Sequence, residues 1–416
     1  MNPKKQQVAN ETLEVEIERI LPGGVGLAHA EGLTLFVSLA APGDRVRVKV
    51  DRVQGKVAFA SIVEILTPSP VRVEPPCPYF GLCGGCDFQQ LSYDVQLATK
   101  VEIIKDCLHR IGKIDGPIDV PILASPREWQ YRTRAMWQVD ADKRKVGYFV
   151  RGSREVCDVE YCAVLVSPLQ NTLEKVRTEI LSENGTTPTP RDIAVVLGDD
   201  GISIYPPIAG FETREVHRVV EDEIYEYSAE AFFQVNHGML EALIAEAIGD
   251  ISGKIAIDLY SGVGLFTLPL TRRFEEVVAV EANPEAMRFA RRSLESANLD
   301  RIELANLDVG EWLQHYRSFE PIDILLLDPP RTGVENKVIA GIVGLRPQRI
   351  VYVSCDPATL ARDLKKLIAE GYSFDKIAAF DMFPQTHHVE MVVHLSDTIA
   401  LIDDSDLADI SDFNVD

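Results

Sequence analysis

The sequence predicts an α/β protein with a small N-terminal β-barrel, a mixed central domain and a C-terminal doubly wound parallel sheet. The chain has 416 residues, more than one ordinary domain of roughly 100–200 residues. Residues 11–66 alternate apolar and polar side chains, with Gly or Pro-Gly breaks roughly every eight to twelve residues. From about residue 251, strand-like and helix-like segments alternate. These three observations together predict three folded parts.

The N-terminal segment is expected to form a small antiparallel barrel. Repeated prolines in residues 68–78 then indicate a linker, because proline can neither donate to a strand ladder nor continue a helix. The G-x-G-x-A start at residues 24–28 and the A-P-G-D turn at residues 41–44 resemble a TRAM domain, a small RNA-binding barrel of the oligonucleotide-binding type. A barrel that only packs against its neighbour is the alternative.

The C-terminal segment reads as buried strands joined by helical crossovers. Residues 254–260 and 276–282 are strand-like, and residues 283–299 form a helical pattern with apolar side chains near 3.6 spacing. Strand-like runs also precede Asp328 and Cys355. This alternation predicts a mostly parallel, doubly wound sheet. For residues 87–250 the pattern does not specify a fold.

The composition indicates a soluble globular protein, with 46% hydrophobic and 25% charged residues. No apolar run reaches the roughly 18 residues that span a bilayer, and the N-terminus lacks the apolar segment of a secretory signal. A cytoplasmic protein without a membrane partner is therefore expected. The acidic excess lies after residue 170 and includes residues 397–416, a tail without Lys or Arg that is expected to be disordered.

The net charge of −22 argues against a nucleic-acid ligand for the chain as a whole, because phosphate contacts require Lys and Arg. Residues 127–154 differ, since they are rich in basic side chains with aromatic ones between them. Basic groups bind phosphates and aromatic rings stack on bases, so this segment is a candidate RNA surface. Its candidate contacts are Arg132, Arg134, Lys143 and Arg144. A charged antiparallel hairpin without a ligand is the alternative.

Three cysteines lie within ten residues, at Cys77, Cys83 and Cys86, and Cys157 and Cys162 follow much later. Thiolates are soft ligands that suit zinc or an iron–sulfur cluster. Paired Cys-x-x-Cys units would favour zinc, and the second pair is missing. The spacing with a remote fourth ligand therefore favours a cluster over zinc or ordinary buried thiols.

A glycine-rich turn at residues 258–267 follows a strand and precedes a helix. Gly262 and Gly264 allow a cofactor to approach a helix N-terminus closely. Glu281 ends the next strand, where an acid can hold ribose hydroxyls. Because Thr267 stands where a dinucleotide site has its third glycine, the turn favours an S-adenosyl-L-methionine methyltransferase over a dehydrogenase.

Two further motifs follow strand ends, the edge of an open sheet where ligands bind. Asp328 begins D-P-P-R-T-G, and Cys355 lies before a helix, whose dipole is expected to lower the pKa of the thiol. Glu390 lies in an apolar run, where burial could raise the pKa of the carboxyl into the range of a general base. A buried cysteine and an ion-paired glutamate are the structural alternatives. Adjacent His387 and His388 point in opposite directions on a strand, which argues against a metal site.

Taken together, these motifs resemble the RNA uracil-5 methyltransferase family, in particular bacterial 23S rRNA enzymes with a TRAM domain and an iron–sulfur cluster. The resemblance covers about residues 11–395 and rests on C-x5-C-G-G-C, FQVN, DLYSGVGLF, DPPRTG, VSCDPATLARDL and DMFPQTHHVE. It implies a TRAM barrel at residues 8–68, a central domain with cluster and RNA surface at 69–230, a Rossmann-like class I methyltransferase domain at 231–396, and the tail at 397–416.

The resemblance also implies roles for individual residues. The 4Fe-4S cluster ligands would be Cys77, Cys83, Cys86 and Cys162. Cys355 would be the nucleophile and Glu390 the general base. The S-adenosyl-L-methionine site would hold Gln234, Tyr260, Gly262, Gly264, Glu281 and Asp328, with Asp308 near the adenine. Leu265 replaces an asparagine of some relatives, and Asn306 competes with Asp308 for the adenine side.

The resemblance implies methylation of carbon 5 of a uridine, expected in 23S rRNA, by a monomeric enzyme that does not act on DNA. A tRNA substrate is one alternative. An RNA cytosine-5 methyltransferase is another, but it normally needs a second cysteine beside a proline, and residues 328–333 contain none. A catalytically silent RNA-binding or ribosome-assembly protein is the alternative of another class.

Overall fold

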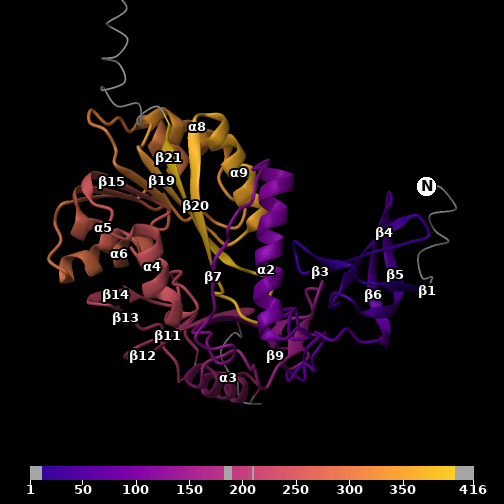
Figure 1. Ribbon diagram of the computed structural model, residues 1–416. Coiled ribbons are helices and arrows are strands. Elements are labelled where there is room, and N and C mark those ends of the chain that lie inside the picture. The colour runs from indigo at the N-terminus through magenta and orange to yellow at the C-terminus, as the bar shows by residue number, and fades with distance from the viewer. Residues whose placement is uncertain (1–11, 182–189, 209, 399–416) are drawn as a thin grey trace, which may run out of the picture.

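The computed structural model describes residues 12–181, 190–208 and 210–398, so most of the expected acidic tail lies outside the described residues. Figure 1 shows an N-terminal barrel beside a large α/β layer, with a smaller sheet and helix α3 below them. Among the described residues, the helices are all too short or too polar to cross a lipid bilayer.

The barrel forms from alternating side chains as expected, but it is not purely antiparallel, because β4 pairs parallel with β6. Its strands follow the order β1-β5-β6-β4-β3-β2, and Val46, Val48 and Val50 point into its core. Asp44 in the A-P-G-D turn is buried, accepts a hydrogen bond from the Ala41 N–H at 2.7 Å, and pairs with Arg72 of the linker. The strands are β1 (Thr12–Glu16), β2 (Arg19–Leu21), β3 (Val25–Ala30), β4 (Leu33–Ser38), β5 (Arg45–Gln54) and β6 (Val57–Thr67).

The C-terminal layer is a mostly parallel sheet of strand order β17-β16-β15-β18-β19-β21-β20-β7, in which β21 runs antiparallel to β19 and β20. The sheet is buried on both faces, so successive residues of β18 pack into two different hydrophobic cores. Leu325 and Leu327 lie in the core on one face, and Ile324 and Leu326 lie in the core on the other. The strands are β15 (Gly253–Leu259), β16 (Phe274–Val280), β17 (Ile302–Ala305), β18 (Ile324–Leu327), β19 (Arg349–Ser354), β20 (Tyr372–Phe380) and β21 (Glu390–Asp397).

Helices cover both faces of this sheet. One face packs against α4, α5 and α6, and the other against α7, α8 and α9. Asn283 and Asp356 accept hydrogen bonds from the first free N–H groups of α6 and α9 and so fix where these helices begin. The helices are η2 (His237–Met239), α4 (Leu240–Ile248), α5 (Thr267–Arg273), α6 (Pro284–Ser296), α7 (Val309–His315), α8 (Asn336–Leu345) and α9 (Pro357–Ala369).

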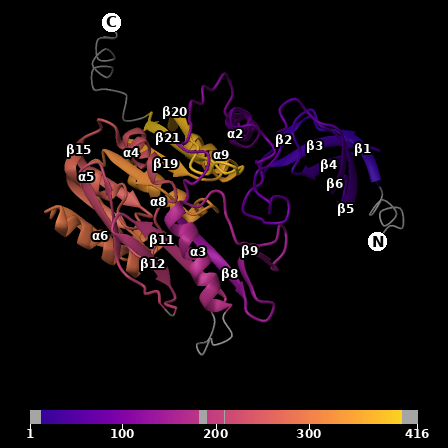
Figure 2. The ribbon, with the colours of Figure 1, turned by 90° about the horizontal axis from the view of Figure 1, so that it is seen from below.

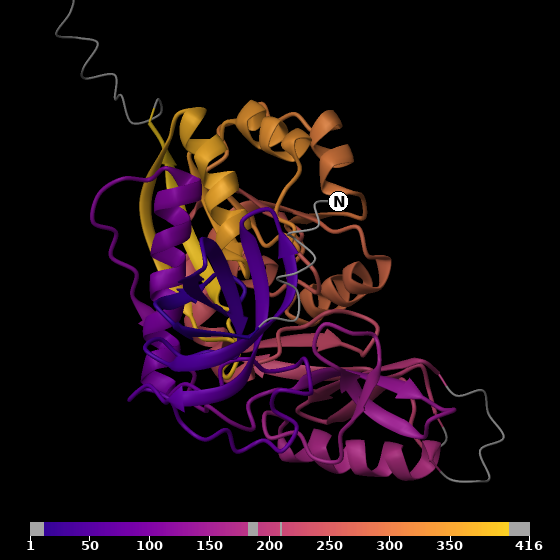
Figure 3. The ribbon, with the colours of Figure 1, turned by 90° about the vertical axis from the view of Figure 1, so that its right-hand side faces the viewer.

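Part of the expected central domain joins the C-terminal layer. Helix α2 (Tyr93–Cys107) continues into η1 (Leu108–Gly112), which contacts α9, and β7 (Ile122–Leu123) pairs parallel with β20. In Figure 1, α2 lies between the barrel and the yellow strands of the sheet, and Figure 3 shows the same purple helix beside the indigo barrel. Residues 93–123 therefore belong structurally with the sheet that carries Glu390, although the sequence analysis groups them with residues 69–230.

The remaining central residues form a sheet of order β10-β9-β8-β11-β12, covered by α3, and a separate two-stranded sheet of β13 and β14. Trp137, Leu173 and Ile193 lie in the core between this sheet and α3, and Figure 2 shows α3 beside β8 and β11. A Cβ at Gly147 would lie 2.2 Å from the Cys157 carbonyl oxygen, so only glycine allows β9 and β10 to pair this closely. The elements are β8 (Arg134–Asp140), β9 (Lys145–Phe149), β10 (Val156–Asp158), α3 (Ser167–Ile180), β11 (Asp192–Gly198), β12 (Gly201–Tyr205), β13 (Val216–Val220) and β14 (Glu223–Tyr227).

Candidate active site

A cavity of about 660 Å³, named here the catalytic cavity, opens at the carboxyl ends of β15, β18 and β19. This is the edge at which open parallel sheets bind ligands. Of the residues expected at the cofactor site, Gln234, Tyr260, Gly262, Glu281 and Asp328 line it. Cys355 and Glu390 line the same cavity.

In the turn after β15, two glycines adopt the positive φ angles that other residues rarely adopt. Gly262 and Gly264 have φ of +55° and +94°, and a Cβ at Gly264 would lie 3.1 Å from the Leu268 Cδ1 atom. Glu281 follows β16 and accepts hydrogen bonds from the N–H groups of Gly262 at 3.0 Å and Asn283 at 2.7 Å. The carboxylate thus fixes the turn and faces the cavity.

Two buried carboxyls lie beneath this turn and the D-P-P motif. Burial raises the pKa of Asp258 to about 7, although the Thr267 hydroxyl donates to one of its oxygens. The other oxygen, Oδ1, has no hydrogen-bond partner among the described residues. Burial also raises the pKa of Asp328 to about 7.

Cys355 and Glu390 are brought together by the antiparallel pairing of β19 with β21, in which Ser354 lies opposite Met391. Glu390 is only 2% exposed, and burial together with the charge of Asp328 raises the pKa of its carboxyl well above the usual range. Arg331 lines the same cavity and opposes this increase.

The expected lowering of the Cys355 pKa is wrong for this structure. Burial and then the charge of Glu390 raise the pKa of the thiol to about 12, and Arg331 only partly opposes them. The N-terminus of α9 does not offset this increase, because the Asp356 carboxylate already accepts the N–H groups of Ala358 and Thr359. In the free protein, Cys355 is therefore a thiol at neutral pH.

Other expected contacts lie outside the catalytic cavity. Asp308 caps α7 by accepting the Glu311 N–H at 3.1 Å and lies 3.5 Å from the Lys337 ammonium. Asn306 donates to the Glu281 and Ala282 carbonyl oxygens. Neither lines the cavity, so the adenine contact of Asp308 stays a prediction.

The structure adds two aromatic side chains that the sequence reasoning missed. Phe232 is 57% exposed and lines the cavity beside Gln234, and Phe383 lines it from the loop after β20. The sequence signal for Phe232 is that a second aromatic residue stands directly before FQVN; its exposure is known only from the structure. Phe383 lies inside the DMFPQTHHVE motif, but its direction depends on how the loop folds.

The loop of residues 381–389 leads to Glu390 and is held by segments distant in sequence. Lys100 of α2 is fully buried, pairs with Asp381 and donates to the Phe383 carbonyl oxygen at 3.1 Å. Gln96 of α2 bonds to Gln385. The Asp87 carboxylate accepts the His387 N–H at 2.8 Å and lies 2.6 Å from its Nδ1 atom.

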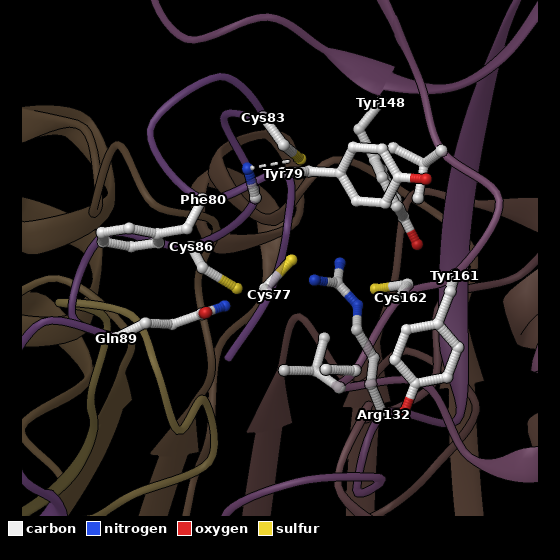
Figure 4. A pocket seen from close by; sticks show the side chains of 14 residues that line it. Cys77, Tyr79, Phe80, Cys83, Cys86, Gln89, Arg132, Tyr148, Tyr161 and Cys162 are labelled. Carbon is white, nitrogen blue, oxygen red and sulfur yellow. Dashed lines mark hydrogen bonds between the residues drawn. The ribbon is translucent and has the colours of Figure 1, made fainter. Parts of the chain in front are cut away.

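The four cysteines expected as cluster ligands surround one small cavity of about 30 Å³ (Figure 4). Cys77, Cys83 and Cys86 come from the segment before α2, and Cys162 comes from the loop after β10. Cys157 does not line this cavity. The Arg132 guanidinium lies among the sulfurs in Figure 4. Within residues 12–181, 190–208 and 210–398, no three His, Cys, Asp or Glu side chains are arranged to hold a metal ion.

The four basic residues expected on an RNA surface do not lie together. Arg132 and Arg134 are partly buried and line the catalytic cavity, where Arg134 donates to the Ala231 and Ala229 carbonyl oxygens. Lys143 and Arg144 lie at the exposed turn between β8 and β9. Their contact with RNA stays a prediction.

Comparison with known proteins gives two family matches. Residues 6–63 match the TRAM domain, and residues 212–398 match the family described as tRNA (Uracil-5-)-methyltransferase. The chain is 30% identical to the 23S rRNA (uracil(1939)-C(5))-methyltransferase RlmD of Shewanella sediminis, over 94% of this chain and 96% of that protein. The RlmD protein of Vibrio parahaemolyticus is 31% identical, over 93% and 96% of the two chains.

A solved structure is similar over almost the same length. The tRNA (uracil-54, C5)-methyltransferase of Pyrococcus abyssi, in complex with S-adenosyl-L-homocysteine, has a TM-score of 0.70 and 25% sequence identity. The alignment covers 92% of this chain and 100% of that one. The barrel, the sheet and the connection between them are therefore shared with a uracil-5 methyltransferase.

Proposed function

The chain belongs to the RNA uracil-5 methyltransferase family, and from this premise we propose that it methylates carbon 5 of one uridine through a covalent bond between Cys355 and the uracil ring. The observation that carries the proposal is that Cys355 and Glu390 line the same cavity as the glycine turn after β15. A thiol, a carboxyl and a nucleotide-type turn in one cavity match the requirements of this reaction.

The residues present fit S-adenosyl-L-methionine. The Gly262 position has open space where a Cβ would lie, and Asp258 Oδ1 is buried without a partner among the described residues. Tyr260, Glu281 and Asp328 would hold the adenosine and methionine parts. When bound, S-adenosyl-L-methionine supplies an electrophilic methyl group.

Carbon 5 of uracil is too weak a nucleophile to take up that methyl group unaided. The Cys355 sulfur would add to carbon 6 of the ring, so that the electrons of the carbon 5–carbon 6 double bond become available at carbon 5. Since the free Cys355 thiol is protonated, its proton would pass to solvent as the uracil binds, and the resulting thiolate forms the carbon–sulfur bond. Glu390 would then remove the carbon 5 proton of the methylated ring, and the carbon–sulfur bond would break to release thiolate and 5-methyluridine.

The substrate is proposed to be 23S rRNA. Two relatives that cover almost the whole chain carry 23S rRNA in their names, whereas the similar solved structure is named for a tRNA. A tRNA is therefore the second candidate. An RNA substrate would place the enzyme in the cytoplasm, and the target base must leave its stack to reach Cys355.

Mapping of 5-methyluridine in total RNA tests this proposal. RNA from a strain that lacks the protein should have lost the modification at one 23S rRNA uridine, and expression of the wild-type chain should restore it. Expression of the Cys355→Ala variant should not. Loss confined to tRNA would assign the tRNA alternative, and an unchanged map in both RNAs would contradict the proposed function.

We also propose that Cys77, Cys83, Cys86 and Cys162 hold a 4Fe-4S cluster. The chemistry of the donors supports this proposal, since all four thiols line one cavity and thiolates are soft ligands. Among the described residues the sulfurs are not arranged to hold a metal ion, so cluster binding requires them to draw together and the Arg132 guanidinium to move aside. Burial raises the pKa of Cys86 to about 12 without a metal, and a bound metal would favour the thiolate instead. The cluster takes no part in the methyl transfer described above.

Protein purified without oxygen should contain iron and inorganic sulfide and absorb broadly in the visible range. Cys77→Ala should lose iron and either solubility or RNA affinity, while methyl transfer by the protein that remains should fall less. Cys157→Ala is the matched control, because Cys157 is buried outside the cavity and should leave the iron content unchanged. Zinc without sulfide in the wild-type protein would rule out the cluster.

A further inference from the structure

A second groove, named here the barrel-side groove, lies next to the catalytic cavity and has no role in the reaction described above. Its volume is about 740 Å³, and it is lined by Gly23 of the barrel, by the segment around Gly84 and Asp87, by β8 and β9 with the turn after β9, and by His387. Four parts of the chain that are distant in sequence thus meet around one groove.

The groove adjoins the catalytic cavity. Met136 of β8 lines both of them and is 45% exposed. His387, three residues before Glu390, lines the groove from the loop that delivers that carboxyl. A polymeric ligand that places one of its monomers beside Cys355 can therefore extend past Met136 into the groove.

The charge and the side chains of the groove suit RNA. Arg151 and Arg154 line it, and Arg154 is exposed. The carboxylate in the lining, Asp87, is already hydrogen-bonded to His387. Phe149 is 42% exposed and also lines the groove. Proteins usually bind single-stranded RNA with cationic side chains that contact phosphates and aromatic rings that stack on bases. This basic groove contrasts with the net charge of −22 of the whole chain.

The size of the groove favours an unpaired strand over a double helix. About 740 Å³ is the volume of a pocket that encloses one small ligand, which suits one or two nucleotides. Gly84, Gly85 and Gly152 keep the floor and rim free of side chains. The Gly84 N–H donates to the Phe149 carbonyl oxygen, and the Arg151 N–H donates to the Leu82 carbonyl oxygen. These bonds fix the cysteine segment, residues 77–86, against β9, so the floor of the groove is held by regular backbone hydrogen bonds.

We propose that the barrel-side groove holds the unpaired RNA nucleotides next to the target uridine, with Phe149 stacked on a base and Arg154 on a phosphate. The inference rests on the proposed function, because it places the target base at Cys355. It assigns the RNA path to the surface where the cysteine segment, the strands β8 and β9 and the edge of the barrel meet, which differs from the exposed β8–β9 turn of Lys143 and Arg144.

Fluorescence anisotropy with a labelled 12-nucleotide oligouridine tests the groove. Phe149→Ala should weaken binding about tenfold through loss of one stacked base. Arg154→Ala should weaken binding and lower the slope of log Kd against log salt by about 0.7, the value for one phosphate on a single strand. Arg301→Ala is the matched control, because Arg301 is exposed at the far edge of the large sheet and should bind as wild type does.

All variants should bind S-adenosyl-L-homocysteine with wild-type affinity, which shows that they are folded. The proposal would be overturned if both groove variants bound oligouridine with wild-type affinity, or if the wild type did not bind it. It would also be overturned if a matched RNA duplex bound more tightly, or if a polyglutamate peptide competed equally well. Methyl transfer to 23S rRNA by the wild type is measured separately. If the wild type does not methylate 23S rRNA but the groove variants weaken oligouridine binding as expected, the proposed function is contradicted and the groove is still an RNA-binding site.

Discussion

Replacement of Cys355 by alanine is expected to abolish methyl transfer and every covalent adduct with RNA. Loss of the nucleophile in covalent catalysis typically costs about a million-fold in rate, so no product should be detectable. Cys157→Ala is the matched control, because that buried cysteine lies outside the catalytic cavity. Its activity should equal that of the wild type, which separates loss of the nucleophile from a general effect of removing a thiol.

Glu390→Gln is expected to stop the reaction one step later. The amide cannot accept the carbon 5 proton, so addition and methyl transfer should occur and elimination should fail, with turnover about 10²–10⁴-fold lower. Replacement of the Glu390 carboxyl also removes one cause of the raised pKa of Cys355, which favours addition. The protein–RNA bond should therefore accumulate.

Denaturing gels with labelled 23S rRNA transcript distinguish the two variants. Glu390→Gln should show a persistent protein–RNA band only when S-adenosyl-L-methionine is present. A transcript with 5-fluorouridine should trap the wild type in the same way, because fluorine cannot leave as a proton does. If Cys355→Ala retains activity, or Glu390→Gln turns over normally, the roles of these residues are misassigned.

Lys100→Met should strongly destabilise the protein, although Lys100 lies outside the catalytic cavity. Lys100 and Asp381 are both fully buried and form an ion pair. Removal of one partner of such a pair leaves an uncompensated buried charge and typically costs about 3–5 kcal/mol of unfolding free energy. Because Lys100 also holds the Phe383 carbonyl oxygen, the loop that leads to Glu390 should loosen and methyl transfer should fall with stability.

Urea unfolding of three variants checks this prediction. Lys105→Met changes an exposed lysine of the same helix and should have little effect. The double variant Lys100→Met with Asp381→Asn leaves no buried charge and should recover much of the unfolding free energy. A single Lys100→Met variant as stable as the wild type would show that the buried pair contributes little.

Strands and helices of the large sheet could be predicted from sequence because their patterns are local. Apolar runs such as that before Asp328 form β18, and the Asp356-Pro357 step starts α9 where it was expected. The place of β7 could not be predicted, because it spans two residues and pairs with a strand more than 250 residues later. Tertiary contacts decide such short strands.

The sequence motifs predicted residues that line one cavity, but they did not predict the electrostatics of these residues. Motifs placed Asp328 and Cys355 at strand ends, which meet at one edge of a sheet, and placed Glu390 in an apolar run. The pKa of Cys355 instead depends on how deeply the thiol is buried and on its distance from Glu390. The sequence predicted that a helix begins after Cys355. It did not predict that the Asp356 carboxylate accepts the N–H groups of Ala358 and Thr359 at the start of that helix.

The loop of residues 381–389 has a consequence for how the protein is made. Its partners Asp87, Gln96 and Lys100 precede it by 300, 289 and 281 residues. The barrel consists of local strand pairings and can form while the rest of the chain is still being synthesised, since domains generally fold as units and N-terminal ones first. Because the loop connects β20 to β21, we expect it to become ordered only after these last strands have left the ribosome. Methylating activity therefore arises at the end of synthesis, when a nearly complete chain closes on itself.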